Sequence, residues 1–169
     1  VAKNVMVIDG QGQTMLPGLI DAHGHVLGYG HSLLRVDLVD TASETDAVNR
    51  TISYNQDNPS ISWVLGRGWN QVQWTNNTYP TAKSLDKAFP NKPVWLRRVD
   101  GHAGWANSKA MALAGITSKS ESPLGGEIIK DVNGQPTGVF IDNAMELIIA
   151  SIPEPSIEED KVALTKAMQ

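Results

Sequence analysis

Apolar and polar positions follow two periodicities along most of this chain, one typical of strands and one typical of helices. Apolar runs predict strands at 63–68 and 93–98, and a helical pattern at 81–89 lies between them and ends at a proline. This order of strand, helix and strand indicates an α/β protein. Upstream, Ser43 and the acidic residues that follow it predict a helix over 44–56.

The second half of the chain predicts a hairpin among helices. Residues 126–130 and 137–141 have strand patterns, and the Asn133-Gly134 pair between them is a strong turn signal. The helical patterns here are capped by polar residues or ended by glycine. They predict helices at 107–114, at 143–152 and after Ser156, with a further short helix within 26–38.

The first 25 residues have the pattern of extended segments. Weak alternation at 4–8, a turn-rich stretch at 9–13 and a second extended pattern at 14–16 predict a hairpin. Leu19 and Ile20 then begin what the pattern predicts to be a buried strand.

Two histidines, His23 and His25, stand one residue apart at the end of this strand. Side chains of a strand alternate between its faces, so both imidazoles project to one side, and Gly24 leaves room between them. Imidazole nitrogens suit zinc and its first-row neighbours, and a catalytic zinc has about three protein ligands. The pair therefore predicts part of a metal site. The alternative is that both are polar residues where a strand enters a loop.

The segment Leu16–His25 resembles the first barrel strand of the metal-dependent amidohydrolase superfamily, with its P-G-hydrophobic-I-D-x-H-x-H signature. Arg98–Ser108 and Gly134–Val139 resemble the subfamily called amidohydrolase family 3, which includes formamide deformylase-like enzymes. The three segments occur in order, so the resemblance covers essentially the whole chain. It implies an α/β fold: a partial (β/α)8 amidohydrolase barrel, or TIM barrel, with the start of a β-sandwich and an inserted α/β subdomain.

The resemblance divides the chain into four parts. Residues 1–16 are expected in the N-terminal β-sandwich, 17–26 in the first barrel strand with the metal motif, 27–135 in the inserted subdomain over the active site, and 136–169 in the next barrel strand and its helices. Spacing also favours an insertion, because more than a hundred residues separate the histidine pair from the next candidate barrel strand. Loops between barrel strands and helices usually take only a few residues.

The length of the chain predicts a piece of a longer protein. It has 169 residues, begins with valine and stops inside a helical pattern, whereas a complete barrel takes roughly 250 residues. The resemblance places two further histidines and a proton-shuttling Asp outside the chain. We therefore expect the chain on its own to be inactive, since two imidazoles hold a metal weakly.

The resemblance also suggests further site residues. Asp142 falls near the position of the acidic or lysine bridging ligand in related enzymes, but it suits the cap of the following helix equally well. The family's D-G-H segment lines the pocket, which makes Asp100 and His102 substrate-binding candidates. The alternative for His102 is a hydrogen bond inside its own turn. Trp69 forms either an aromatic wall of the pocket or part of the core.

Composition narrows the chemistry and the partners. The net charge of −4 and the scattered lysines and arginines argue against binding to nucleic acid. The chain has no cysteine, so a bound metal must be held by nitrogen and oxygen. No apolar run approaches the roughly 20 residues of a membrane helix. We expect a soluble protein, cytoplasmic or exported, that acts on a small molecule; the oligomeric state is left open.

These observations predict a metal-dependent hydrolase that cleaves C–N bonds of amides, formamides or cyclic amides. One or two divalent ions, most simply zinc, would lower the pKa of bound water to about 7 so that hydroxide attacks the carbonyl. The alternative is a non-catalytic or regulatory relative of the family. The intact histidine pair favours the hydrolase.

Overall fold

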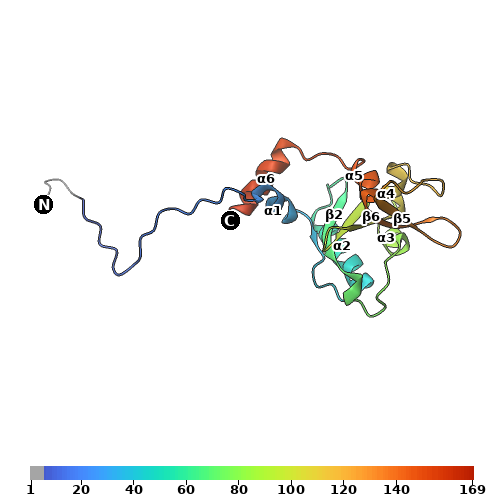
Figure 1. Ribbon diagram of the computed structural model, residues 1–169, viewed down its shortest axis with the longest axis horizontal. Helices are drawn as coiled ribbons and strands as arrows, with labels where there is room; N and C mark the ends of the chain where they lie inside the picture. Colours follow the sequence, from blue (N-terminus) through green and yellow to red (C-terminus); the bar gives the residue numbers. More distant parts are fainter. Residues whose placement is uncertain (1–5) are drawn as a thin grey trace.

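A six-stranded sheet forms the centre of the computed structural model, which describes residues 6–169 (Figure 1). The strands have the order β1-β2-β3-β4-β6-β5 across the sheet. Their bounds are Val36–Asp37 (β1), Val64–Trp69 (β2), Val94–Arg98 (β3), Ala103–Ala106 (β4), Gly126–Lys130 (β5) and Pro136–Asp142 (β6). The helices are Val26–Ser32 (α1), Glu44–Asp57 (α2), Ala82–Ala88 (α3), Ser108–Leu113 (α4), Glu146–Ile149 (α5) and Ile157–Ala167 (α6), with short 3₁₀ helices at Gln71–Gln73 (η1) and Asn143–Met145 (η2).

The sheet is mixed. Strands β1, β2 and β3 are parallel, whereas β4, β5 and β6 pair in antiparallel fashion. The predicted strand, helix and strand unit is confirmed as β2, α3 and parallel β3. The predicted hairpin is confirmed as β5 and β6, with Gly134 at φ 76° in the turn. The mixed α/β class is therefore confirmed.

The two longest helices begin at the polar N-cap residues that the sequence predicts. The hydroxyl of Ser43 accepts a hydrogen bond from the backbone N–H of Asp46 at 3.0 Å, at the start of α2. Ser156 and Glu159 form a reciprocal capping box at the start of α6. Each such cap contributes about 1 kcal/mol by satisfying N–H groups that have no partner within the helix.

Alternate strand residues supply two hydrophobic clusters, one on each face of the sheet. Val94 and Leu96 of β3 belong to the cluster that includes residues of α2 and α3. Trp95, between them, belongs to the cluster that includes residues of α4 and α5. In Figure 1, α2 and α3 lie below the sheet, and α4 and α5 lie above it.

Residues 6–25 form an extended segment that runs away from the sheet (Figure 1). Leu19 and Ile20, expected in a buried strand, are 98% and 93% exposed, and no residue of this segment belongs to a strand. The structure thus has neither the predicted hairpin nor the predicted barrel strand here; residues 4 and 5 lie outside the described part. A strand needs hydrogen-bonding neighbours, and no described strand pairs with this segment.

The sheet continues across the expected boundary between residues 135 and 136. Strand β6, expected as the next barrel strand, lies between β4 and β5 and pairs with both. The tight turn at Gly134 joins β6 directly to β5, which explains why the two strands share one sheet. Within residues 6–169, no helix is long and apolar enough to span a membrane.

Helices α1 and α6 lie side by side although they come from opposite ends of the chain (Figure 1). Gly30 of α1 faces α6 so closely that a Cβ at this position would lie 2.1 Å from the carbonyl oxygen of Ala163. His31 Nε2 and Asp160 Oδ1 are 2.8 Å apart in the same contact. A glycine is therefore required where the helices approach.

Candidate functional site

The histidine pair lies just before α1, at the end of the extended segment. His23 and His25 are exposed, and the centroids of their rings are 5.0 Å apart with the rings nearly perpendicular. The carboxylate of Asp21 accepts a hydrogen bond from the backbone N–H of His23 at 2.9 Å. This bond turns the chain immediately before the pair.

The spacing of the two rings fits joint binding of one ion. With Zn–N bonds of about 2.1 Å, two imidazoles on one tetrahedral zinc have ring centroids roughly 5 Å apart. Two nitrogen donors nevertheless make only part of a site. Within residues 6–169, no three His, Cys, Asp or Glu side chains come together as a metal-binding group.

A second group of polar residues lies along one edge of the sheet, and we call it the His102 cluster. It gathers residues from the carboxyl ends of β2, β3 and β6 and from the turn before β4. Its members are Asn70, Gln71, Arg98, Asp100, His102 and Asp142. The structure does not bring this cluster into one metal-binding group with the histidine pair.

His102 and Asp142 form a close pair at the centre of this cluster. Nδ1 of His102 lies 2.8 Å from Oδ1 of Asp142, and the backbone N–H of Asp142 donates to the carbonyl of His102 at 3.0 Å. An ionised carboxylate only accepts hydrogen bonds, so Nδ1 carries the proton. In a neutral ring, Nε2 is then free to accept a hydrogen bond or bind an electrophile. The imidazole is 75% exposed and open to a ligand.

Asp142 adopts a backbone conformation that is costly for a residue with a Cβ. Its φ and ψ are 46° and −123°, and its side chain makes no capping bond to η2, the helix that follows. Of the two roles considered for Asp142, the cap is therefore absent. The carboxylate is directed to His102 instead. Strain of this kind amounts to about 1–3 kcal/mol and is concentrated at functional sites.

Asp100 fixes the turn that carries His102. One carboxylate oxygen accepts the backbone N–H of His102 at 3.0 Å, and the other pairs with the guanidinium of Arg98. Arg98 in turn donates from Nε to the side-chain carbonyl of Gln71 at 2.9 Å. Arg98 thus forms an ion pair at the end of β3, and nothing in the sequence pattern indicated Gln71 as its second partner.

Trp69 belongs to the core. It is 0% exposed, its Nε1 donates to the carbonyl of Leu96 at 2.8 Å, and its ring contacts those of Trp74 and Trp105. Of the two roles considered for Trp69, its burial favours the core, because the side chain has no exposed surface in this structure. The rings of Trp74, Tyr79 and Trp105 pack around it.

The α/β fold and the paired imidazoles of His23 and His25 together indicate the class: an α/β protein with a candidate metal site. The chain belongs to the Amidohydrolase family, whose sequence model matches residues 6–169. This agrees with the family indicated by the three sequence segments.

Curated proteins and solved structures extend this finding. The chain is 37% identical to YtcJ of Bacillus subtilis over 158 residues, 94% of this chain and 30% of that protein. It is 36% identical to N-substituted formamide deformylase of Arthrobacter pascens over 149 residues, 87% of this chain and 28% of that protein. A crystal structure of a metal-dependent hydrolase from Pyrococcus horikoshii superposes with a TM-score of 0.62 at 26% identity, covering 87% of this chain and 27% of that one. The chain thus spans about 30% of the length of the curated relatives it matches.

Proposed function

We propose that the protein is a metal-dependent hydrolase that cleaves C–N bonds of amides, formamides or cyclic amides. The observation that carries this proposal is the pair of exposed imidazoles at His23 and His25, whose rings are 5.0 Å apart. Support comes from membership of the Amidohydrolase family and from a relative whose name states that it deformylates N-substituted formamides.

The donor set favours a divalent metal, and zinc suits it best. His23 and His25 would hold the ion through neutral nitrogen, with no thiolate available because the chain has no cysteine. A bound zinc supplies a water of lowered pKa, about 7, as the nucleophile. No third potential ligand comes together with them within residues 6–169, so these two imidazoles are a partial site.

His102 would contact the substrate through Nε2. Asp142 holds Nδ1 and thereby fixes both the tautomer and the direction of the ring. Asp100 fixes the turn through the backbone N–H of His102, and Arg98 neutralises the carboxylate of Asp100. We assign Asp142 the role of orienting His102 in preference to that of a bridging metal ligand, because one of its two oxygens is already engaged by the imidazole.

Hydrolysis of three compound classes tests the proposal. The intact protein is loaded with zinc and assayed against an N-substituted formamide, a linear amide and a cyclic amide, with product amine or acid measured. We expect turnover of at least one class that a chelator removes and added zinc restores. A protein that binds zinc but hydrolyses none of the three would instead be a non-catalytic relative of the family.

A further inference from the structure

One cavity in the described part of the chain is lined by no residue of the histidine pair or of the His102 cluster. It has a volume of about 410 Å³, and a smaller cavity of about 240 Å³ adjoins it. Both lie between the sheet and residues 152–155, the segment that connects α5 to α6, and they share Arg35 and Leu65 as lining residues. We call the two together the connector cleft.

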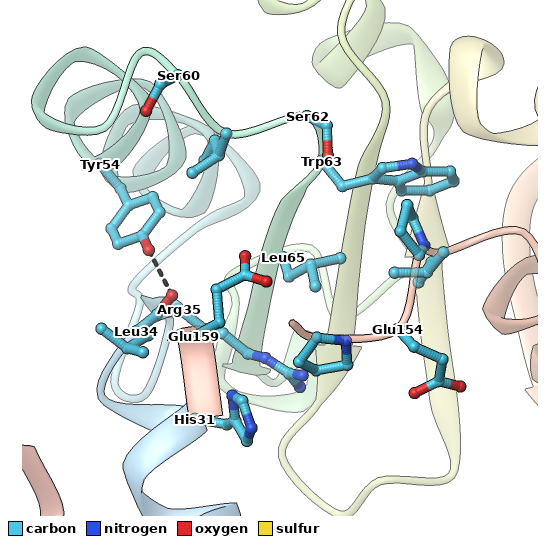
Figure 2. Close-up of a pocket in the computed structure, with 14 residues that line it drawn as sticks. His31, Leu34, Arg35, Tyr54, Ser60, Ser62, Trp63, Leu65, Glu154 and Glu159 are labelled. Atoms are coloured by element: carbon cyan, nitrogen blue, oxygen red, sulfur yellow. Dashed lines mark hydrogen bonds between the residues drawn. The ribbon is translucent and has the colours of Figure 1, made fainter. Parts of the chain in front are cut away.

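Two arginines line this cleft without a carboxylate partner. Arg35 makes no side-chain hydrogen bond or ion pair within residues 6–169, and Figure 2 shows its guanidinium extending into the cavity between His31 and Leu65. Arg97 lines the smaller cavity; it donates to the carbonyl of Gly101 at 3.2 Å, but its Nε is buried with no partner. Both arginines are partly exposed, and charged groups withdrawn from water are usually paired.

Trp95, which also lines the smaller cavity, has an indole N–H without a partner in the described part of the chain. Its side chain is only 3% exposed. A buried indole N–H usually finds a partner. The Nε1 of Trp95 and the Nε of Arg97 are the two buried side-chain donors without a partner in the described part of the chain, and both belong to residues that line one cavity.

No carboxylate near the cleft pairs with Arg35 or Arg97 within residues 6–169. Glu159 accepts hydrogen bonds from the backbone N–H and the hydroxyl of Ser156, and Asp160 pairs with His31. The carboxylate of Glu154 points away from Arg35 in Figure 2 and forms no ion pair. Neither guanidinium therefore has an ion-pair partner within residues 6–169, and both are available to a ligand in a cleft that Glu154 and Glu159 also line.

Burial and the neighbouring charge of Arg97 both lower the pKa of Arg35. The charged form of its guanidinium is therefore less favourable here than in water. An anion placed near the two guanidiniums would offset their mutual repulsion. The remaining walls are apolar, with Leu65, Ile149 and Ile152 among them. Such walls suit the apolar body of a ligand better than a fully hydrated anion.

We propose that the connector cleft binds a small carboxylate with an apolar body, whose carboxylate is held by Arg35 and Arg97. This cleft is separate from the residues to which we assigned roles in hydrolysis. The bond of Arg97 to the carbonyl of Gly101, the residue before His102, links the cleft to the His102 cluster.

Calorimetric titration of the intact protein with benzoate tests this site. We expect one saturable site for benzoate and none for benzyl alcohol, which has a similar body without the charge. Arg35→Gln and Arg97→Gln should each weaken benzoate binding at least about tenfold, since a charge-assisted bond is lost. Arg50→Gln removes a guanidinium on α2 that bonds the carbonyl of Val39, outside the cleft, and should leave binding unchanged.

Further variants separate this site from its alternatives. Binding should persist in the His23→Ala, His25→Ala double variant, so loss of benzoate there would place it on the metal and overturn the proposal. The proposal is equally overturned if benzoate fails to bind, if inorganic phosphate binds as tightly, or if binding occurs only after Glu154→Gln, which would make Glu154 the natural occupant. Arg35→Lys keeps the charge and should retain part of the affinity, which separates loss of the site from loss of folding.

Discussion

Asn107 provides a quantitative test of how the sheet and its helices are held together. Its side chain is fully buried and makes four hydrogen bonds. Oδ1 accepts from the backbone N–H of Val94 and of Ala110, each at 3.0 Å. Nδ2 donates to the carbonyls of Phe89 and Lys92, each at 2.9 Å. One side chain thus joins the start of β3, the cap of α4 and the loop after α3.

Asn107→Ala should therefore lower the free energy of unfolding by about 4 kcal/mol. Each of the four bonds contributes about 1 kcal/mol net, and the backbone groups left behind have no access to water. The bond to Ala110 is also the N-cap of α4, a contribution of similar size. With a urea m-value of about 2 kcal/mol/M, the unfolding midpoint should fall by roughly 2 M.

Urea unfolding followed by tryptophan fluorescence and circular dichroism measures this shift. Asn76→Ala, at an exposed asparagine, is the matched control and should change stability by no more than about 0.5 kcal/mol. If the midpoint of Asn107→Ala moved no further than that of the control, the assigned role of this hydrogen-bond network would be refuted.

Three other predictions follow from the structure. Gly30→Ala should lower the melting temperature because its Cβ would lie 2.1 Å from a carbonyl oxygen of α6, whereas Gly28→Ala, with open space, should not. The capping hydrogen bonds from Ser156 lower the pKa of Glu159. This carboxylate therefore stabilises the fold fully at pH values above the ordinary pKa of glutamate, and the stabilisation is lost as pH falls through the lowered pKa. Glu159→Gln should reduce the fall in the free energy of unfolding at acid pH, measured by denaturation across a range of pH. Asp142→Gly should relieve about 1 kcal/mol of backbone strain and raise the melting temperature. It should also lower kcat by about tenfold or more because His102 loses its orienting partner, and a wild-type kcat in this variant would contradict the assigned role.

The helices with explicit end signals could be predicted from the sequence alone. The expected helix at 44–56 is observed as Glu44–Asp57, and the hydroxyl of Ser43 makes the expected capping bond. The hairpin at Asn133-Gly134 was equally predictable, because its turn chemistry is local. Features that depend on adjacent residues were therefore recovered.

Features that depend on strand order were not recoverable from the sequence. Strand β4, Ala103–Ala106, is buried at every position, so it has no alternation to reveal it. His102 and Asp142 are 40 residues apart and meet only because β4 lies next to β6. The extended segment at 6–25 had a strand pattern, but a strand forms only against neighbours, and no described strand provides them.

The metal content of the intact protein tests the central claim most directly. Protein purified with and without the His23→Ala, His25→Ala double substitution is analysed for bound divalent metal and assayed for hydrolysis of an N-substituted formamide or amide. The account predicts bound metal and turnover in the wild type and the loss of both in the double variant. Full metal content and full turnover in the double variant would contradict it.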